Sequence, residues 1–173
     1  MKAFVTGGTG FVGSYLVKRL VEKNLYVRVF DNNLRGDINR LQTISKRIDF
    51  INGDITNYDE VYEATKNIDT IFHLAYINGT RNFYNYPEKV LEVGVKGALT
   101  TLDCALTHGV SNYIVTSSSE VYQEPTIYPT SENEDLNFIG ILRKNLNKDR
   151  LKNYQQFNSS DFVDEIVSEI PPT

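Results

Sequence analysis

The segment FVTGGTGFVGSYL, residues 4–16, joins a short apolar run to an amphipathic pattern through spaced glycines. The apolar run reads as a buried strand, and the amphipathic pattern reads as a helix that begins between Gly10 and Gly13. Together with Gly7, these glycines allow a tight turn, a close backbone approach and close packing of the helix on a sheet. This order predicts the first unit of a parallel α/β fold, with free backbone N–H groups at the turn.

Short apolar runs and helical patterns keep alternating as far as residue 119. Parallel strands joined by right-handed crossovers predict an open, doubly wound sheet with the strand order 3-2-1-4-5. The first helix is expected to place Val12 on its apolar face together with Leu16, Leu20 and Val21. The predicted strands are residues 2–6, 26–31, 47–54, 69–76 and 112–119, and the predicted helices are residues 12–24, 57–67 and 86–108.

The chain has 173 residues, of which 40% are hydrophobic and 23% charged, so its composition is that of a globular protein with about one domain. We expect residues 1–135 to form this domain and residues 136–173 to form a divergent, partly helical tail. The net charge of −4, without a basic face in the first 135 residues, argues against nucleic-acid binding. The N-terminus enters the first strand directly and leaves no room for a membrane span, which favours a soluble, cytoplasmic protein.

An acid closes the second predicted strand. Asp31 follows Gly13 by 18 positions, close to the spacing at which a carboxylate accepts hydrogen bonds from the ribose hydroxyls of a dinucleotide. That carboxylate would also repel a 2′-phosphate, so NAD is favoured over NADP, although Arg35 is the kind of residue that accommodates such a phosphate. A second interpretation, in which Asp31 only forms a turn before Asn32 and Asn33, stays open.

With these features in place, the sequence resembles the extended short-chain dehydrogenase/reductases, and among them the NAD-dependent nucleotide-sugar epimerases and dehydratases. The resemblance covers about the first 135 residues and implies a Rossmann-like domain without the C-terminal substrate domain, with NAD as cofactor and a nucleotide-sugar as substrate. It rests on the motifs TGGTGFVG (6–13), NNLRG (32–36), NGDITN (52–57), HLAY (73–76), VGVKGALTTLDCA (93–105) and TSSSEVY (116–122).

The resemblance also implies roles for single residues. Ser118 would hydrogen-bond the substrate hydroxyl, and its alternative role is to cap the end of the fifth strand. Asp54 and Ile55 would flank the adenine, and the backbone of residues 74–76 would line the nicotinamide half of the cofactor. The residues expected to bind the cofactor are Gly7, Gly10, Phe11, Val12, Gly13, Asp31, Asn32, Asn33, Arg35, Asp54, Ile55, Leu74, Ala75 and Tyr76.

Two departures from the family pattern concern the chemistry. The family removes the hydroxyl proton with a tyrosine whose pKa is lowered by a lysine four residues later. Residues 138–157, where this pair is expected, do not contain it. The only tyrosine in the sequence with a lysine four residues later is Tyr62, with Lys66, which we interpret as a coincidence on the helix between the third and fourth strands. Gly94 stands where the pattern usually has an asparagine that organises the site.

Three hypotheses follow. The chain is an epimerase or dehydratase whose base comes from elsewhere, a catalytically inactive NAD-binding module, or part of a split enzyme completed by a subunit or by self-association; the missing pair favours the second. No metal site is expected, because His73 has no second histidine or cysteine nearby and reads as a buried strand-end residue. Cys104 is expected to be a buried helical side chain.

Overall fold

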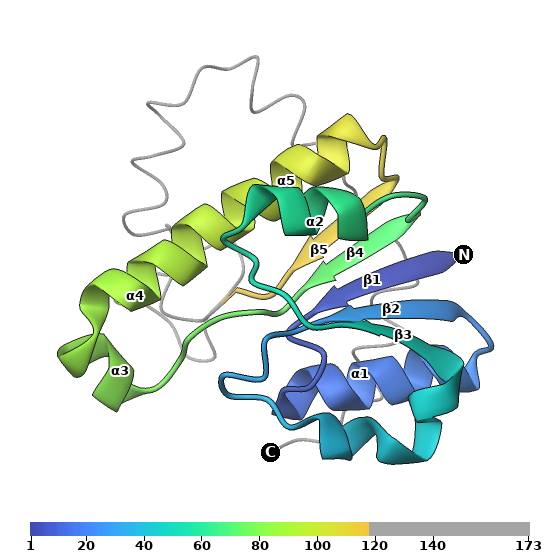
Figure 1. The fold of residues 1–173 in the computed structure, drawn as a ribbon, viewed down its shortest axis with the longest axis horizontal. Coiled ribbons are helices and arrows are strands. Elements are labelled where there is room, and N and C mark those ends of the chain that lie inside the picture. The colour runs from blue at the N-terminus through green and yellow to red at the C-terminus, as the bar shows by residue number, and fades with distance from the viewer. Residues whose placement is uncertain (118–173) are drawn as a thin grey trace, which may run out of the picture. The chain divides into compact units, whose positions relative to one another are not determined.

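The computed structural model describes residues 1–117, and Met1–Val115 belong to one compact unit. The centre of this unit is a parallel sheet in the order β3-β2-β1-β4-β5, so the predicted order is confirmed (Figure 1). Thr6 pairs with Phe30 on one side and with His73 on the other, which aligns the carboxyl ends of three strands. The strands are β1 (Lys2–Thr6), β2 (Tyr26–Phe30), β3 (Ile48–Ile51), β4 (Thr70–His73) and β5 (Asn112–Val115).

The first helix, α1 (Phe11–Glu22), begins between Gly10 and Gly13, as predicted. Leu16, Leu20 and Val21 are buried on its inner face. Val12 is 43% exposed, so its predicted place on that face is wrong. At this end of the helix it is Gly13 that packs against the backbone of the glycine turn, which directs Val12 outward.

Alternate side chains of β1 point into two separate cores, as expected for a strand. Phe4 packs with buried residues of the helices α2 (Tyr58–Ala64) and α5 (Gly97–Thr107), whereas Ala3 and Val5 pack with those of α1. Figure 1 shows α1 on one face of the sheet and α2 and α5 on the other. Because both faces are covered, the strands are nearly continuous apolar runs.

The helix predicted for residues 86–108 is present but not uniform. It begins at α4 (Pro87–Leu91), passes through a π-helical turn, η2 (Glu92–Lys96), and continues as α5. Pro87 lies in the first turn of α4, and Gly109, with φ of +64°, follows the last turn of α5. The helix between the third and fourth strands is capped by Asn57, whose side chain accepts the Asp59 N–H at 3.2 Å.

Two short elements were not predicted: α3 (Thr80–Asn85) and the 3-10 helix η1 (Ile38–Arg47). No residue of α3 is buried, and Leu41 is the buried residue of η1. Helix α3 buries no apolar side chain that would mark it in the sequence, whereas in η1 Ile38, Leu41 and Ile44 recur every third residue, which is the spacing of a 3-10 helix and not of an α-helix.

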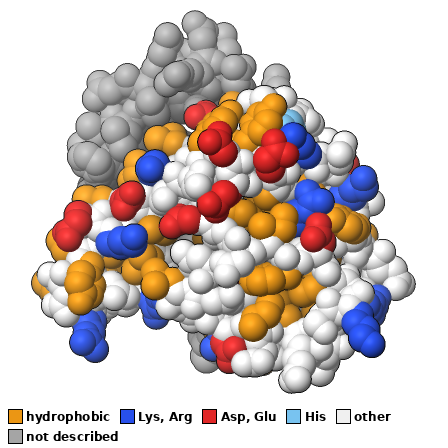
Figure 2. All heavy atoms as spheres, viewed as in Figure 1, with side chains coloured by type: hydrophobic (Ala, Val, Ile, Leu, Met, Phe, Trp, Pro, Cys, Tyr) orange, Lys and Arg blue, Asp and Glu red, His pale blue; other side chains and the backbone are white. Residues whose placement is uncertain are grey.

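Other predictions can be compared with the structure only over its first 117 residues. None of the helices in these residues has the length and the apolar composition of a membrane span. Figure 2 shows acidic and basic side chains interspersed on the face of the molecule that it presents. Cys104 is fully buried on α5, as predicted, and burial raises the pKa of its thiol to about 11. The domain boundary at residue 135 and the tail of residues 136–173 lie outside the described residues.

Candidate functional site

The glycine turn after β1 is too tightly packed for side chains. Gly7 has φ of +69°, and a Cβ at this position would lie 2.8 Å from the Ala75 backbone nitrogen. A Cβ at Gly13 would lie 2.8 Å from the Gly8 Cα and would fall on the Gly7 carbonyl oxygen. The turn closes with a hydrogen bond from the Gly10 N–H to that same carbonyl at 3.1 Å. The first N–H groups of α1 have no acceptor within the helix and remain available for a ligand.

Asp31 joins three loops at the carboxyl end of the sheet. Its carboxylate oxygens accept the Thr9 N–H at 3.0 Å and the Asn33 N–H at 2.8 Å. Its own N–H donates to the Ile51 carbonyl at 3.2 Å. The side chain is only 8% exposed, and each oxygen keeps a lone pair for a further donor. Asp31 therefore forms the turn before Asn33 and is also placed to receive a ligand hydroxyl.

A hollow of about 190 Å³ opens where β1, β2, β3 and β4 end. Ten of the fourteen predicted cofactor residues line it, whereas Phe11, Val12, Gly13 and Asn33 do not. Six further lining residues were not predicted; four of them lie within the quoted motifs, but Lys89, in the first turn of α4, does not. The predicted residues that line the hollow are Gly7, Gly10, Asp31, Asn32, Arg35, Asp54, Ile55, Leu74, Ala75 and Tyr76, and the additional ones are Leu34, Gly36, Gly53, Ile77, Lys89 and Val93.

Asp54 and Ile55 form the wall of the hollow at the end of β3. One Asp54 oxygen accepts the N–H and the hydroxyl of Thr56 at 2.9 and 2.8 Å, so part of this carboxylate holds its own turn. Ile55 is 5% exposed and packs against Gly97, where a Cβ would lie 2.8 Å from the Ile55 Cγ1. The wall is thus held in place by a polar turn on one side and by α5 on the other.

A buried polar network shapes the opposite wall, at the end of β4. The Thr6 hydroxyl accepts the N–H groups of Leu74 and Ala75 at 3.2 and 3.1 Å, which ends the strand three residues earlier than predicted. Its single hydrogen is therefore donated to His73 Nδ1 at 2.9 Å, which leaves the imidazole proton on Nε2. His73 is 4% exposed, so its predicted burial is confirmed, and burial lowers the pKa of this histidine to about 4.

We expect Thr6→Val to lower the free energy of unfolding by about 2 kcal/mol, because the Ala75 N–H and His73 Nδ1 each lose their hydrogen bond with the Thr6 hydroxyl. Urea unfolding of the full chain measures this change. Thr107→Val is the matched control, since it removes an exposed hydroxyl that bonds only its own helix; we expect it to change stability by less than about 0.5 kcal/mol. Equal losses in the two variants would contradict the role of the Thr6 hydroxyl.

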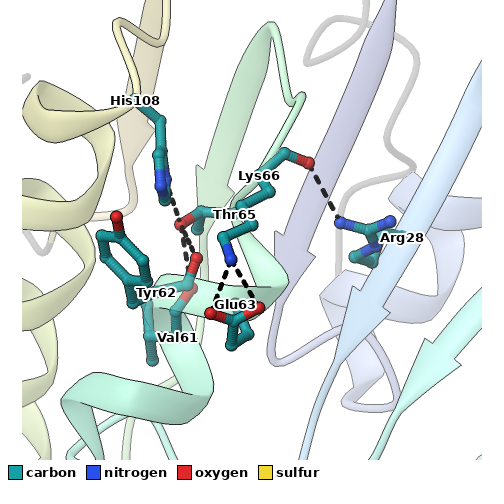
Figure 3. A network of polar contacts seen from close by, with 7 residues as sticks. All are labelled: Arg28, Val61, Tyr62, Glu63, Thr65, Lys66 and His108. Atoms are coloured by element: carbon teal, nitrogen blue, oxygen red, sulfur yellow. Dashed lines mark hydrogen bonds and ion pairs between the residues drawn. The ribbon is translucent and has the colours of Figure 1, made fainter.

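Tyr62 and Lys66 have structural partners and do not line the hollow. The Lys66 ammonium binds the Glu63 carboxylate at 2.6 and 2.7 Å and lies 5.3 Å from the Tyr62 ring centroid (Figure 3). The Tyr62 ring packs on His108 with 4.5 Å between centroids. These contacts agree with the interpretation of this pair as a coincidence.

The described residues do not reveal which group would accept the proton of the substrate hydroxyl. Tyr113, on β5, donates to or accepts from the Thr101 hydroxyl at 2.7 Å, and burial raises the pKa of its phenol to about 12. At neutral pH this phenol is protonated and unsuited to act as a base. Ser118, the predicted catalytic residue, and residues 138–157 lie outside the described part of the chain. No group of three potential metal ligands occurs among residues 1–117.

Comparison with known proteins places this geometry in a family. Over 78% of its length the chain is 30% identical to UDP-glucose 4-epimerase 3 of Oryza sativa subsp. japonica, covering 39% of that protein. It is 35% identical over 82% of its length to UDP-glucuronic acid decarboxylase 6 of Arabidopsis thaliana, covering 41% of it. Its fold matches that of UDP-glucose 4-epimerase from Thermotoga maritima, solved with UDP-glucose, with a TM-score of 0.74 and 26% identity. The match covers 84% of this chain and 48% of the Thermotoga maritima chain.

The chain therefore spans about half, or less, of the length of the relatives it matches. The model of the NAD dependent epimerase/dehydratase family matches residues 3–140, which include the glycine turn, Asp31 and the whole sheet from β1 to β5 except Lys2. The parallel sheet, the glycine turn and this match agree, and the chain belongs to the NAD dependent epimerase/dehydratase family.

Proposed function

We propose that this chain binds NAD in the hollow at the carboxyl ends of β1 to β4, as the cofactor-binding part of a nucleotide-sugar epimerase or dehydratase. The observation that carries the proposal is the glycine turn, in which Gly7 and Gly13 leave no space for a Cβ. This close packing lets the backbone approach a diphosphate, and the N-terminus of α1 supplies N–H groups and a positive dipole end. The residues present therefore fit a dinucleotide.

Different residues in and beside the hollow suit different parts of NAD. The N–H groups of Phe11, Val12 and Gly13, at the start of α1, would hold the diphosphate although these three residues are not among those that line the hollow. Asp31 would accept hydrogen bonds from the adenosine ribose, and its charge favours NAD over NADP. Lys89 lines the hollow without an ion pair to any described residue, and its ammonium would offset the charge of the diphosphate.

The substrate class comes from the relatives, whose names describe enzymes acting on UDP-sugars. Bound NAD would accept a hydride from a sugar carbon and return it. Ser118 would orient the reacting hydroxyl. Because the sequence carries no Tyr-x-x-x-Lys pair after residue 137, the proton acceptor would come from another residue or from a partner chain. The same observation supports a second candidate, an NAD-binding module that does not turn over.

The first test of this proposal is NAD binding itself. Calorimetry is expected to show that the full chain binds NAD more tightly than NADP, and that Asp31→Asn weakens NAD binding about tenfold by removing one charged acceptor. Asp103→Asn is the matched control, because it removes an exposed carboxylate on α5 that lines no described hollow. The absence of NAD binding at millimolar concentration would overturn the proposal, and equal effects of the two variants would overturn the role of Asp31.

Turnover separates the two candidates. The full chain, loaded with NAD, is incubated with UDP-, GDP- and dTDP-sugars while NADH absorbance and sugar products are followed. A product, or transient NADH, supports an epimerase or dehydratase. NAD binding without either supports the inactive module, and activity that requires a second polypeptide supports a split enzyme.

A further inference from the structure

We propose that the side chain of Tyr76 and the glycine at position 94 form a matched pair, in which the Tyr76 ring occupies the space over Gly94 and serves as the aromatic wall for the nicotinamide half of NAD. This inference rests on the proposed NAD binding. The inference goes beyond NAD binding because it assigns a positioning role to the Tyr76 side chain, whereas the family resemblance implied only a role for the backbone of residues 74–76.

The contact between the two residues is close. A Cβ at Gly94 would lie 3.2 Å from the Tyr76 Cδ2 and 3.3 Å from its Cζ, and would overlap the ring edge between them. Only glycine at position 94 therefore lets the Tyr76 ring lie where it does. Tyr76 also lines the hollow and is 48% exposed, so the ring has one side on the helix and another side open.

The backbone beneath the ring has an unusual conformation. Gly94 is the central residue of η2, the π-helical turn between α4 and α5. Single π turns inside α-helices occur frequently at functional sites. The neighbouring Val93 is 9% exposed and lines the same hollow, so this turn contributes directly to the wall.

The position of the ring decides which half of the cofactor it would touch. A dinucleotide lies across the point where the strand order reverses, here between β1 and β4. Asp31, at the end of β2, lies on the side of the adenosine ribose, so the wall that follows β4 faces the other half. An open aromatic face at that place can stack on a flat ring such as nicotinamide.

The test uses two ligands, NAD and ADP, because ADP lacks the nicotinamide half. In calorimetry with the full chain, Tyr76→Ala is expected to weaken NAD binding about tenfold and to leave ADP binding within about twofold. Tyr76→Phe keeps the ring and is expected to retain NAD affinity. Tyr84→Ala is the matched control, since this tyrosine is 81% exposed on α3 and lines neither of the two hollows beside it.

Gly94→Asn tests the pairing. Its side chain displaces the Tyr76 ring, so we expect NAD binding to weaken about tenfold while ADP binding is kept. Adding Gly94→Asn to Tyr76→Ala should weaken NAD binding by less than about a further twofold, because the ring that the asparagine would displace is already absent.

The outcomes distinguish this inference from the proposed function. If the unmodified chain does not bind NAD, the proposed function fails. If it binds NAD but Tyr76→Ala affects neither ligand, or weakens NAD and ADP equally, the role of the ring is overturned. Additive losses in the double variant would overturn the pairing of Tyr76 with Gly94.

Discussion

Gly13→Ala is expected to weaken NAD binding about a hundredfold, the largest effect on binding that we predict, because two charge-assisted amide contacts to the diphosphate are together worth about 3 kcal/mol. The added methyl group would fall on the Gly7 carbonyl oxygen and lie 2.8 Å from the Gly8 Cα. Helix α1 must then move away from β1, and the N–H groups at its start move with it. Gly13 does not line the hollow, so the substitution would affect binding only by moving these N–H groups.

Calorimetry with NAD, together with urea unfolding, separates binding from folding in this variant. Gly109→Ala is the matched control, because its φ of +64° also disfavours a side chain but a Cβ there meets no atom within 4 Å. We expect Gly109→Ala to lose about 1 kcal/mol of stability through backbone strain and to keep its NAD affinity. A folded Gly13→Ala chain with unchanged NAD affinity would contradict the assignment of the glycine turn to the diphosphate.

Acidification is expected to remove up to about 3 kcal/mol of stability through His73 alone. Burial lowers the pKa of this histidine from 6.5 to about 4 in the folded protein. The unfolded chain therefore takes up a proton near pH 6.5, whereas the folded chain takes it up only near pH 4. The stability contributed by the neutral histidine is complete above the first value and decreases as the pH falls toward the second.

The contribution of His73 is measured by comparing the full chain with His73→Gln. Glutamine can accept the hydrogen bond from the Thr6 hydroxyl but does not titrate. Urea unfolding from near neutral pH down to about pH 4.5 should show the stability difference between the two proteins shrinking by about 2 to 3 kcal/mol. Parallel curves would show that His73 is protonated equally easily in the folded and unfolded states.

Much of the fold followed from local pattern. The glycines at 7, 10 and 13, the alternating runs and the acid at 31 predicted a strand, a turn and a helix, and the handedness of crossovers then limited the strand order. Asn57 caps the start of α2 and Gly109 follows the end of α5, within or beside the predicted helix ranges, because caps depend on neighbouring residues only. Val12 was misplaced because its exposure depends on how Gly13 packs against a turn.

The candidate site was predicted less completely. Lys89 and Val93 line the hollow because α4 and η2 pass beside it; Lys89 lies in no quoted motif, and Val93 begins one but was given no role in binding. The π turn at 92–96 also escaped prediction, since its apolar residues still read as one helix with those on either side. Gly94 was recognised only as a departure from a pattern; its contact with Tyr76 supplies a physical reason for a glycine there.

The order of residues along the chain was enough to specify the parallel sheet, the glycine turn and the acid beside it, because each depends on spacing within one or two consecutive elements. Three-dimensional packing alone decided that Thr6 would meet His73, 67 positions away, and that a tyrosine after β4 would lie on a glycine in a π turn. These contacts arise only when β1 pairs with β4 and the following helix closes over their ends, and short-range pattern carries no information about that closure.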